Sequence, residues 1–155
     1  MKPILHILIA LLFMNISQGL LRAAPLTYEG KSGPGKGKHI VFIASDHEYR
    51  GEETCPAIAR IMAHRYGFKC TVLFGLDNEG HIKPGSSNVP GMEVLGKADM
   101  MFLFLRFLHP DDASMKHFTD YLDRGGPVLG LRTTTHAFNG LKGKNSKYNY
   151  NSRDK

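Results

Sequence analysis

Cysteine is scarce in this sequence. Its 155 residues include only Cys55 and Cys70, and neither lies in a C-x-x-C or C-x-x-C-H pattern. Two cysteines are too few for a disulfide scaffold, and the missing patterns exclude a thiol redox centre, a cysteine zinc clip and haem attachment. The rest of the composition, with 42% hydrophobic and 22% charged residues, excludes disordered, collagenous and coiled-coil classes. The length allows one domain.

The sequence also lacks a hydrophobic run at its N-terminus that is long enough to cross a membrane. The apolar segment Ile4 to Ile16 follows Lys2 and is shorter than the ~20 residues of a spanning helix. A positive charge, a short apolar run and small residues at Ser17 and Gly19 are typical of a secretory signal peptide. We therefore expect that residues 1–19 are a signal peptide, that the protein is exported (periplasmic or extracellular) and that it has no stable membrane anchor. The alternative is an uncleaved N-terminal anchor or a buried helix.

The middle of the chain has no excess of positive charge. The formal net charge is +6, but residues 39–140 carry ten Lys and Arg against twelve Asp and Glu. The excess lies in the flanks, where charged segments are usually solvated, and no basic face is expected on the folded part. The charge distribution therefore predicts no nucleic-acid partner.

Residues 26–38 are rich in Gly, Lys, Pro and Ser, which is the composition of a linker. We expect residues 20–38 to be a flexible linker. Gly30 to Lys36 matches the first seven positions of a phosphate-binding P-loop, but Gly37 replaces the required Ser or Thr. The segment also precedes a strand instead of following one, so we expect no nucleotide there.

Apolar runs and helix signals alternate over the following hundred residues. Buried strands are predicted at 39–44, 68–74, 98–107 and 127–131, and helices at 53–66 and 110–124. This alternation predicts an α/β fold with a parallel sheet flanked by helices. Cys55 and Cys70 would lie near opposite ends of the sheet, since the helix after Cys55 rises ~16 Å. We expect two separate thiols.

Almost no apolar residues follow Phe138. We therefore predict a disordered polar tail at 141–155, and a domain, bounded at 39–140, that is incomplete at its C-terminus. Two helices cannot cover both faces of a parallel sheet, so apolar strand surface would be exposed and the chain would be only marginally stable.

Polar side chains follow three of the predicted strands, at the edge where ligands of open parallel sheets bind. Carboxylates, imidazoles and guanidiniums together suit an anionic or polyhydroxylated ligand. We predict that two histidines transfer protons, that two carboxylates orient or act as bases, and that Arg and Thr side chains bind substrate. The catalytic candidates are His47, His136, Asp46 and Glu48, and the substrate-binding candidates are Arg106, Arg132, Thr133 and Thr135.

Plainer interpretations of these residues remain open. Asp46 has the position of a turn or capping residue. A metal site formed by Asp46, His47 and Glu48 is disfavoured, because adjacent residues of a strand point to opposite sides. We expect no metal and no other cofactor.

Four segments of the sequence resemble the ThuA-like (trehalose-utilisation) family of the class I glutamine-amidotransferase-like superfamily. They are Ile40 to Glu53, the Gly67-Phe68 pair, Ala98-Asp99 with its apolar strand, and Gly130 to Phe138, and the resemblance covers residues 38–140. It implies a flavodoxin-like sheet and a role in carbohydrate breakdown, on trehalose or keto-glycosides. Amidotransferases have Cys in a G-x-C-x-G motif where this chain has Arg132, which argues against glutaminase activity.

The resemblance leaves two classes of function open. One is a secreted ThuA-like enzyme of carbohydrate catabolism, and the other is a non-catalytic sugar-binding module or an inactive truncated homologue. Both imply a small-molecule carbohydrate as partner. The oligomeric state is not indicated by the sequence.

Overall fold

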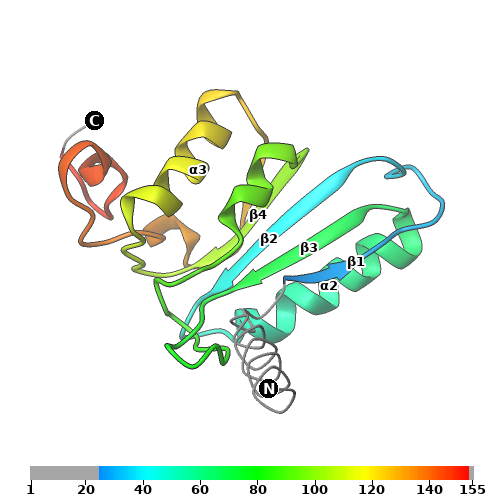
Figure 1. The fold of residues 1–155 in the computed structure, drawn as a ribbon, viewed down its shortest axis with the longest axis horizontal. Helices are drawn as coiled ribbons and strands as arrows, with labels where there is room; N and C mark the ends of the chain where they lie inside the picture. The colour runs from blue at the N-terminus through cyan, green and yellow to red at the C-terminus, as the bar shows by residue number, and fades with distance from the viewer. Residues whose placement is uncertain (1–24, 154–155) are drawn as a thin grey trace, which may run out of the picture.

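The computed structural model describes residues 25–153, and these form a sheet flanked by helices on both faces (Figure 1). The strand order in the sheet is β1-β3-β2-β4-β5, with β1 antiparallel to β3 and the other pairs parallel. The strands are β1 (Leu26–Tyr28), β2 (His39–Ser45), β3 (Lys69–Phe74), β4 (Met100–Leu105) and β5 (Val128–Gly130). The predicted α/β, flavodoxin-like class is confirmed.

One helix covers the first face of the sheet. α2 (Gly51–Tyr66) packs Cys55, Ala59 and Ala63 against alternate residues of the central strands, such as Phe42 and Phe102. Small residues on this side of α2 let the helix approach the sheet closely. Its C-terminus is Gly67, whose left-handed φ of 81° is readily adopted by glycine.

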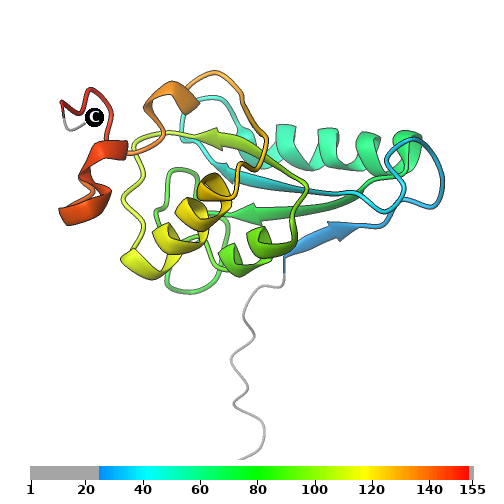
Figure 2. The same ribbon diagram turned by 90° about the horizontal axis from the view of Figure 1, so that it is seen from above.

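The other face is covered by α3 (Asp112–Asp123) and by the 3₁₀ segment η1 (Met92–Lys97). Figure 2 shows α2 on one side of the sheet and α3 with η1 on the other. α3 begins where the Asp111 carboxylate accepts a hydrogen bond from the Ser114 amide at 2.7 Å. Its apolar side buries Met115, Phe118 and Tyr121 in the second core cluster.

Both cysteines are free, as the sequence predicted, and both are buried. Burial raises the pKa of the Cys55 thiol and of the Cys70 thiol to about 12. Both groups therefore remain protonated and act as small apolar residues at neutral pH. Within residues 25–153, no helix has the length and hydropathy needed to span a membrane.

The linker prediction is wrong from residue 26 onward. β1 pairs antiparallel with β3, with Leu26 opposite Val72 and Tyr28 opposite Cys70. Gly35 is buried, its amide donates to the Tyr66 carbonyl at 2.8 Å, and a Cβ on it would overlap the Phe68 ring. Glycine is therefore needed here for close packing, whereas its frequency in the sequence resembled that of a flexible segment. The predicted signal peptide lies outside the described residues.

The prediction of a disordered tail is wrong for residues 141–153. The 3₁₀ segment η3 (Gly143–Tyr148) follows Leu141, whose side chain is buried in the α3 core cluster together with a partly buried Tyr148. The Asn149 side chain holds the backbone of Leu141 through two hydrogen bonds of 2.8 and 2.9 Å. Polar residues thus anchor this segment by specific hydrogen bonds instead of by a large apolar face.

The expected exposure of the central strands is also wrong. β2 and β4 are buried on both faces, because α2 covers one side and α3, η1 and the C-terminal segment cover the other. Exposed strand residues occur on β5, where Val128 is 44% and Leu129 is 40% exposed.

Candidate functional site

Asp46 joins two of the loops that follow the strands. It directly follows β2 and is buried, with only 1% of its surface exposed. Its Oδ1 accepts hydrogen bonds from the amides of Glu48 and Tyr49, each at 2.7 Å, and its Oδ2 accepts one from the Thr133 hydroxyl at 2.5 Å. The carboxylate therefore shapes the loop after β2 and ties it to the loop after β5. The sequence left open a turn role for Asp46, and the structure shows that role. The hydrogen bond to Thr133 in a second loop was not expected from the sequence.

The loops after β2 and β4 meet through an ion pair. Glu48 and Arg106 form a salt bridge in which the Arg106 side chain is 22% exposed and the Glu48 side chain 42%. The Arg106 guanidinium also lies 5.1 Å from the centre of the Phe107 ring. Its Nε is buried and has no hydrogen-bond partner within the described part of the chain. An unpaired buried N–H is unfavourable by ~1 to 3 kcal/mol, so this donor is suited to a ligand oxygen.

The loop after β5 makes a further contact with the loop after β2. The Arg132 guanidinium lies 5.1 Å from the centre of the Tyr49 ring, and both side chains are exposed. The left-handed residue of this loop is Thr133, with φ 82°, which directly follows Arg132. A left-handed conformation is strained for a β-branched residue, and the bond to Asp46 helps to hold it.

His136 belongs to a group of three rings. Its ring centre lies 5.0 Å from that of Phe107 and 5.3 Å from that of Tyr150, and the latter two are 5.8 Å apart. The His136 Nδ1 lies 3.1 Å from the hydroxyl of Thr135. Tyr150 is 47% exposed, so this aromatic cluster is open to solvent on one side.

His47 lies against a different loop. A Cβ placed on Gly85 would be 2.9 Å from the His47 Cβ, so His47 packs directly on the loop that follows β3. The described contacts of His136 involve the loops after β4 and β5 and the C-terminal segment instead. The two histidines are thus held by separate partners, and no hydrogen bond or ring contact joins them among residues 25–153.

The structure brings most of the predicted site residues into contact with neighbours at this edge of the sheet. The contacts link Asp46 with Thr133 and Glu48 with Arg106, and they place Arg132 on Tyr49. Tyr49, Phe107 and Tyr150 were not predicted. Tyr49 and Phe107 stand next to predicted residues and could have been found, whereas nothing local to Tyr150 indicated that it reaches His136.

Comparisons with protein-family models, with curated proteins and with solved structures found no match for this chain.

Proposed function

We propose that this is an exported ThuA-like protein that binds a carbohydrate at the carboxyl edge of its sheet and acts in trehalose or keto-glycoside catabolism. The observation that carries this proposal is the grouping of charged and aromatic side chains from three loops at that edge. Glu48, Arg106 and Arg132 supply the charges, and Tyr49 and Phe107 supply the rings.

This combination suits a sugar for a physical reason. A pyranose has an apolar face of C–H groups that packs on aromatic rings, and a rim of hydroxyls that needs donors and acceptors. Glu48 can accept from hydroxyls, whereas Arg106 and Arg132 can donate to their oxygens. The buried Arg106 Nε has no partner in the described structure, and a ligand oxygen would provide one.

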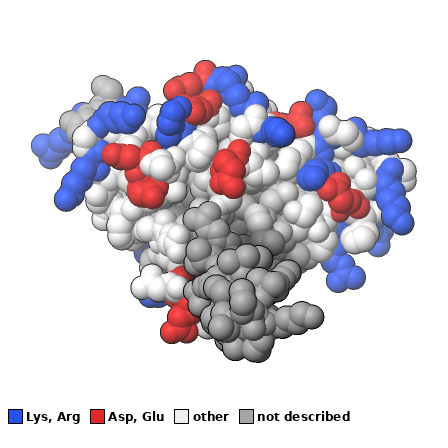
Figure 3. All heavy atoms as spheres, viewed as in Figure 1, with Lys and Arg blue, Asp and Glu red and all other residues white. Residues whose placement is uncertain are grey.

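The charge distribution supports a small ligand in preference to a nucleic acid. On the face drawn in Figure 3, Lys and Arg gather mainly at its two ends. In the same view, Figure 1 places the C-terminal segment at one end and the loop before β2 at the other. Acidic residues lie among and between these basic groups, so this face offers no continuous basic strip for a phosphate backbone.

Catalysis is the second candidate, and one observation favours it. Thr133 holds a left-handed conformation with its hydroxyl on a buried carboxylate, and strained residues of this kind occur at active sites. In this alternative, His136 is the proton-transfer group, since its ring centre lies 5.0 Å from that of Phe107 in the site. His47 packs on another loop, and the Asp46 oxygens already accept three hydrogen bonds. Both are therefore less suited to proton transfer.

Calorimetric titration of the purified chain with trehalose, 3-keto-trehalose, maltose and glucose tests the proposal. We expect one of the disaccharides to bind, and Arg106→Gln and Tyr49→Ala to weaken that binding about tenfold, which corresponds to ~1.4 kcal/mol. Arg65→Gln, on the last turn of α2, is the matched control and should bind normally. Two results would contradict the proposal. One is that none of the four sugars binds, and the other is that the Arg106 and Tyr49 variants bind as tightly as the unmodified chain.

Product analysis on the same sugars then separates the two candidates. Turnover that is lost in His136→Gln would establish an enzyme, and binding without turnover would establish a binding module. Terminal sequencing of protein recovered from the medium and periplasm tests export, which predicts loss of residues 1–19.

A further inference from the structure

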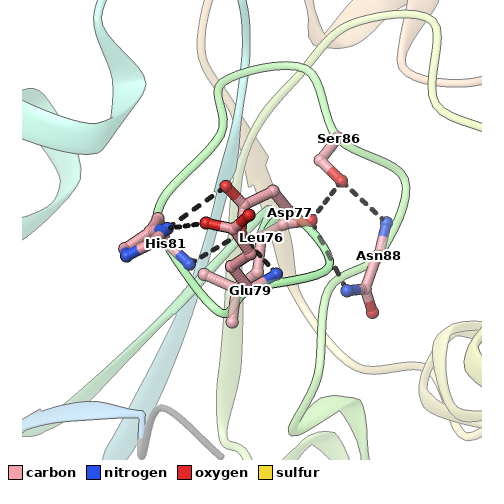
Figure 4. A network of polar contacts seen from close by, with 6 residues as sticks. All are labelled: Leu76, Asp77, Glu79, His81, Ser86 and Asn88. Atoms are coloured by element: carbon pink, nitrogen blue, oxygen red, sulfur yellow. Dashed lines mark hydrogen bonds and ion pairs between the residues drawn. The ribbon is translucent and has the colours of Figure 1, made fainter.

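A second group of ligand-type side chains lies in the long connection between β3 and η1, and the proposed sugar site does not use it. Asp77, Glu79 and His81 occupy alternate positions of one turn, which the bridge between Leu76 and Ile82 closes at its base. Figure 4 shows the three side chains turned toward one another. One oxygen or nitrogen of each lies within 4.8 Å of the others.

The turn holds Asp77 in one orientation. Its Oδ1 accepts hydrogen bonds from the amides of Glu79 and His81, both at 2.9 Å, and its own amide donates to the His81 carbonyl at 2.9 Å. The Leu76 carbonyl is anchored from the other side by the Ser86 hydroxyl at 2.7 Å. Oδ1 is therefore occupied by the turn, and Oδ2 is the oxygen that faces the imidazole.

The separations between the side chains exceed those of short charge-assisted hydrogen bonds. The His81 Nδ1 lies 3.4 Å from the Asp77 Oδ2 and 3.5 Å from the Glu79 Oε2. Charge-assisted hydrogen bonds are shorter, at about 2.7 to 2.9 Å. In tetrahedral zinc sites with bonds of about 2.0 to 2.1 Å, neighbouring ligand atoms are separated by about 3.3 to 3.4 Å. The spacing around His81 therefore matches the edge of a metal coordination sphere better than a hydrogen bond.

We propose that Asp77, Glu79 and His81 bind a zinc ion, with the fourth position open to water or to a ligand from a partner. An imidazole with two carboxylates is a donor set for Zn²⁺, whereas Mg²⁺ and Ca²⁺ prefer oxygen ligands alone. Two carboxylates also neutralise the charge of the ion.

Isothermal titration of the full chain with Zn²⁺, and separately with Mg²⁺, tests the site. We expect one Zn²⁺ per chain, no comparable binding of Mg²⁺, and at least about tenfold weaker Zn²⁺ binding in both His81→Gln and Glu79→Gln. Both variants change exposed side chains, and circular dichroism would establish that they fold. His64→Gln on α2 removes a histidine outside the turn and should bind Zn²⁺ normally.

Three outcomes would overturn the proposal. They are the absence of saturable Zn²⁺ binding, equal binding by the His81 variant, and a loss confined to the His81 variant, which would indicate a single surface histidine. None of them bears on sugar binding at the carboxyl edge, since the two sites share no residue.

Discussion

Asp46 shows how one buried side chain can hold two loops together. Its two oxygens accept hydrogen bonds from two amides of its own loop and from the hydroxyl of Thr133. A buried carboxylate is unfavourable unless it is paired in this way. The same contacts place Glu48 and Tyr49 where they meet Arg106 and Arg132. We therefore assign Asp46 a positioning role.

Replacing Asp46 by Ala should lower the free energy of unfolding by about 2 to 4 kcal/mol, because two amides and one hydroxyl lose their acceptor. Thr133→Val removes only the hydroxyl and should lower it by about 1 kcal/mol. Urea unfolding of the three proteins measures both effects. Equal stability of Asp46→Ala and the unmodified chain would show that these bonds do not stabilise the two loops.

The lowered pKa of His39 in the folded chain leads to a prediction of how stability depends on pH. Burial, and secondarily the charge of Lys69, lowers the pKa of His39 below 6.5 in the folded chain, where its Nε2 lies 2.9 Å from the Thr71 hydroxyl. The unfolded chain then binds a proton near pH 6.5 that the folded chain does not bind. The contribution of the neutral His39 ring to the free energy of unfolding is thus complete above this pH and is lost as the pH falls below it.

The measurement is the urea midpoint at about pH 7.5 and about pH 5.5, on either side of the ordinary histidine pKa. We expect a fall in the midpoint on acidification that is smaller in His39→Gln. His64→Gln is the control and should retain the full dependence. Identical pH dependence in the His39 variant and the unmodified chain would contradict the prediction.

The strands differ in how much they contribute to the core. β4 lies between β2 and β5, and its residues Met101 to Leu105 are buried, whereas all three residues of β5 are exposed. β5 nevertheless directs the chain into the turn of Thr133. Its role is therefore more in positioning the site than in burying apolar surface.

This difference predicts unequal effects of the same substitution on neighbouring strands. Leu103→Ala on β4, at a side chain 3% exposed, should lower the free energy of unfolding by about 2 to 5 kcal/mol. Leu129→Ala on β5, at a side chain 40% exposed, should lower it by less than about 1 kcal/mol. Chemical denaturation measures both. A loss at Leu129 as large as that at Leu103 would mean that β5 is covered in solution.

The C-terminal segment connects the core to the site. Leu141 and Tyr148 pack in the α3 cluster, and the Tyr150 amide donates to the Phe138 carbonyl at 2.7 Å. This arrangement brings the Tyr150 ring to His136 and Phe107. Stability of the fold and completeness of the aromatic cluster therefore depend on the same segment, residues 141–153.

A chain that stops after Gly140 should be less stable by about 2 to 4 kcal/mol, because it loses the buried Leu141 and the cover provided by Tyr148. Lys144→Ala, at an exposed position of the same segment, is the control and should change little. Thermal and urea unfolding provide the measurement. Unchanged stability of the shortened chain would support the disordered tail predicted from sequence.

Local patterns were sufficient to predict β2 to β5, the helices α2 and α3 and the edge of the sheet that carries the polar side chains. A continuous apolar run predicts a buried strand whatever its neighbours are, and acidic first turns and a terminal Gly predict helix ends. The position of Asp46, Glu48, Arg106 and Arg132 follows from strand direction in a parallel sheet. Their individual partners do not follow from it.

The remaining features depend on contacts between residues that are distant in the sequence. The segment before β2 has linker composition, yet Leu26 pairs with Val72 and the glycines allow close packing on Gly67 and Phe68. The C-terminal segment has few apolar residues, yet Asn149 and Leu141 anchor it and place Tyr150 beside His136. Composition shows how many apolar side chains a segment has. Whether they are buried, and which hydrogen bonds the segment makes, depends on the surface against which it packs. That surface exists only after the sheet and its helices have assembled.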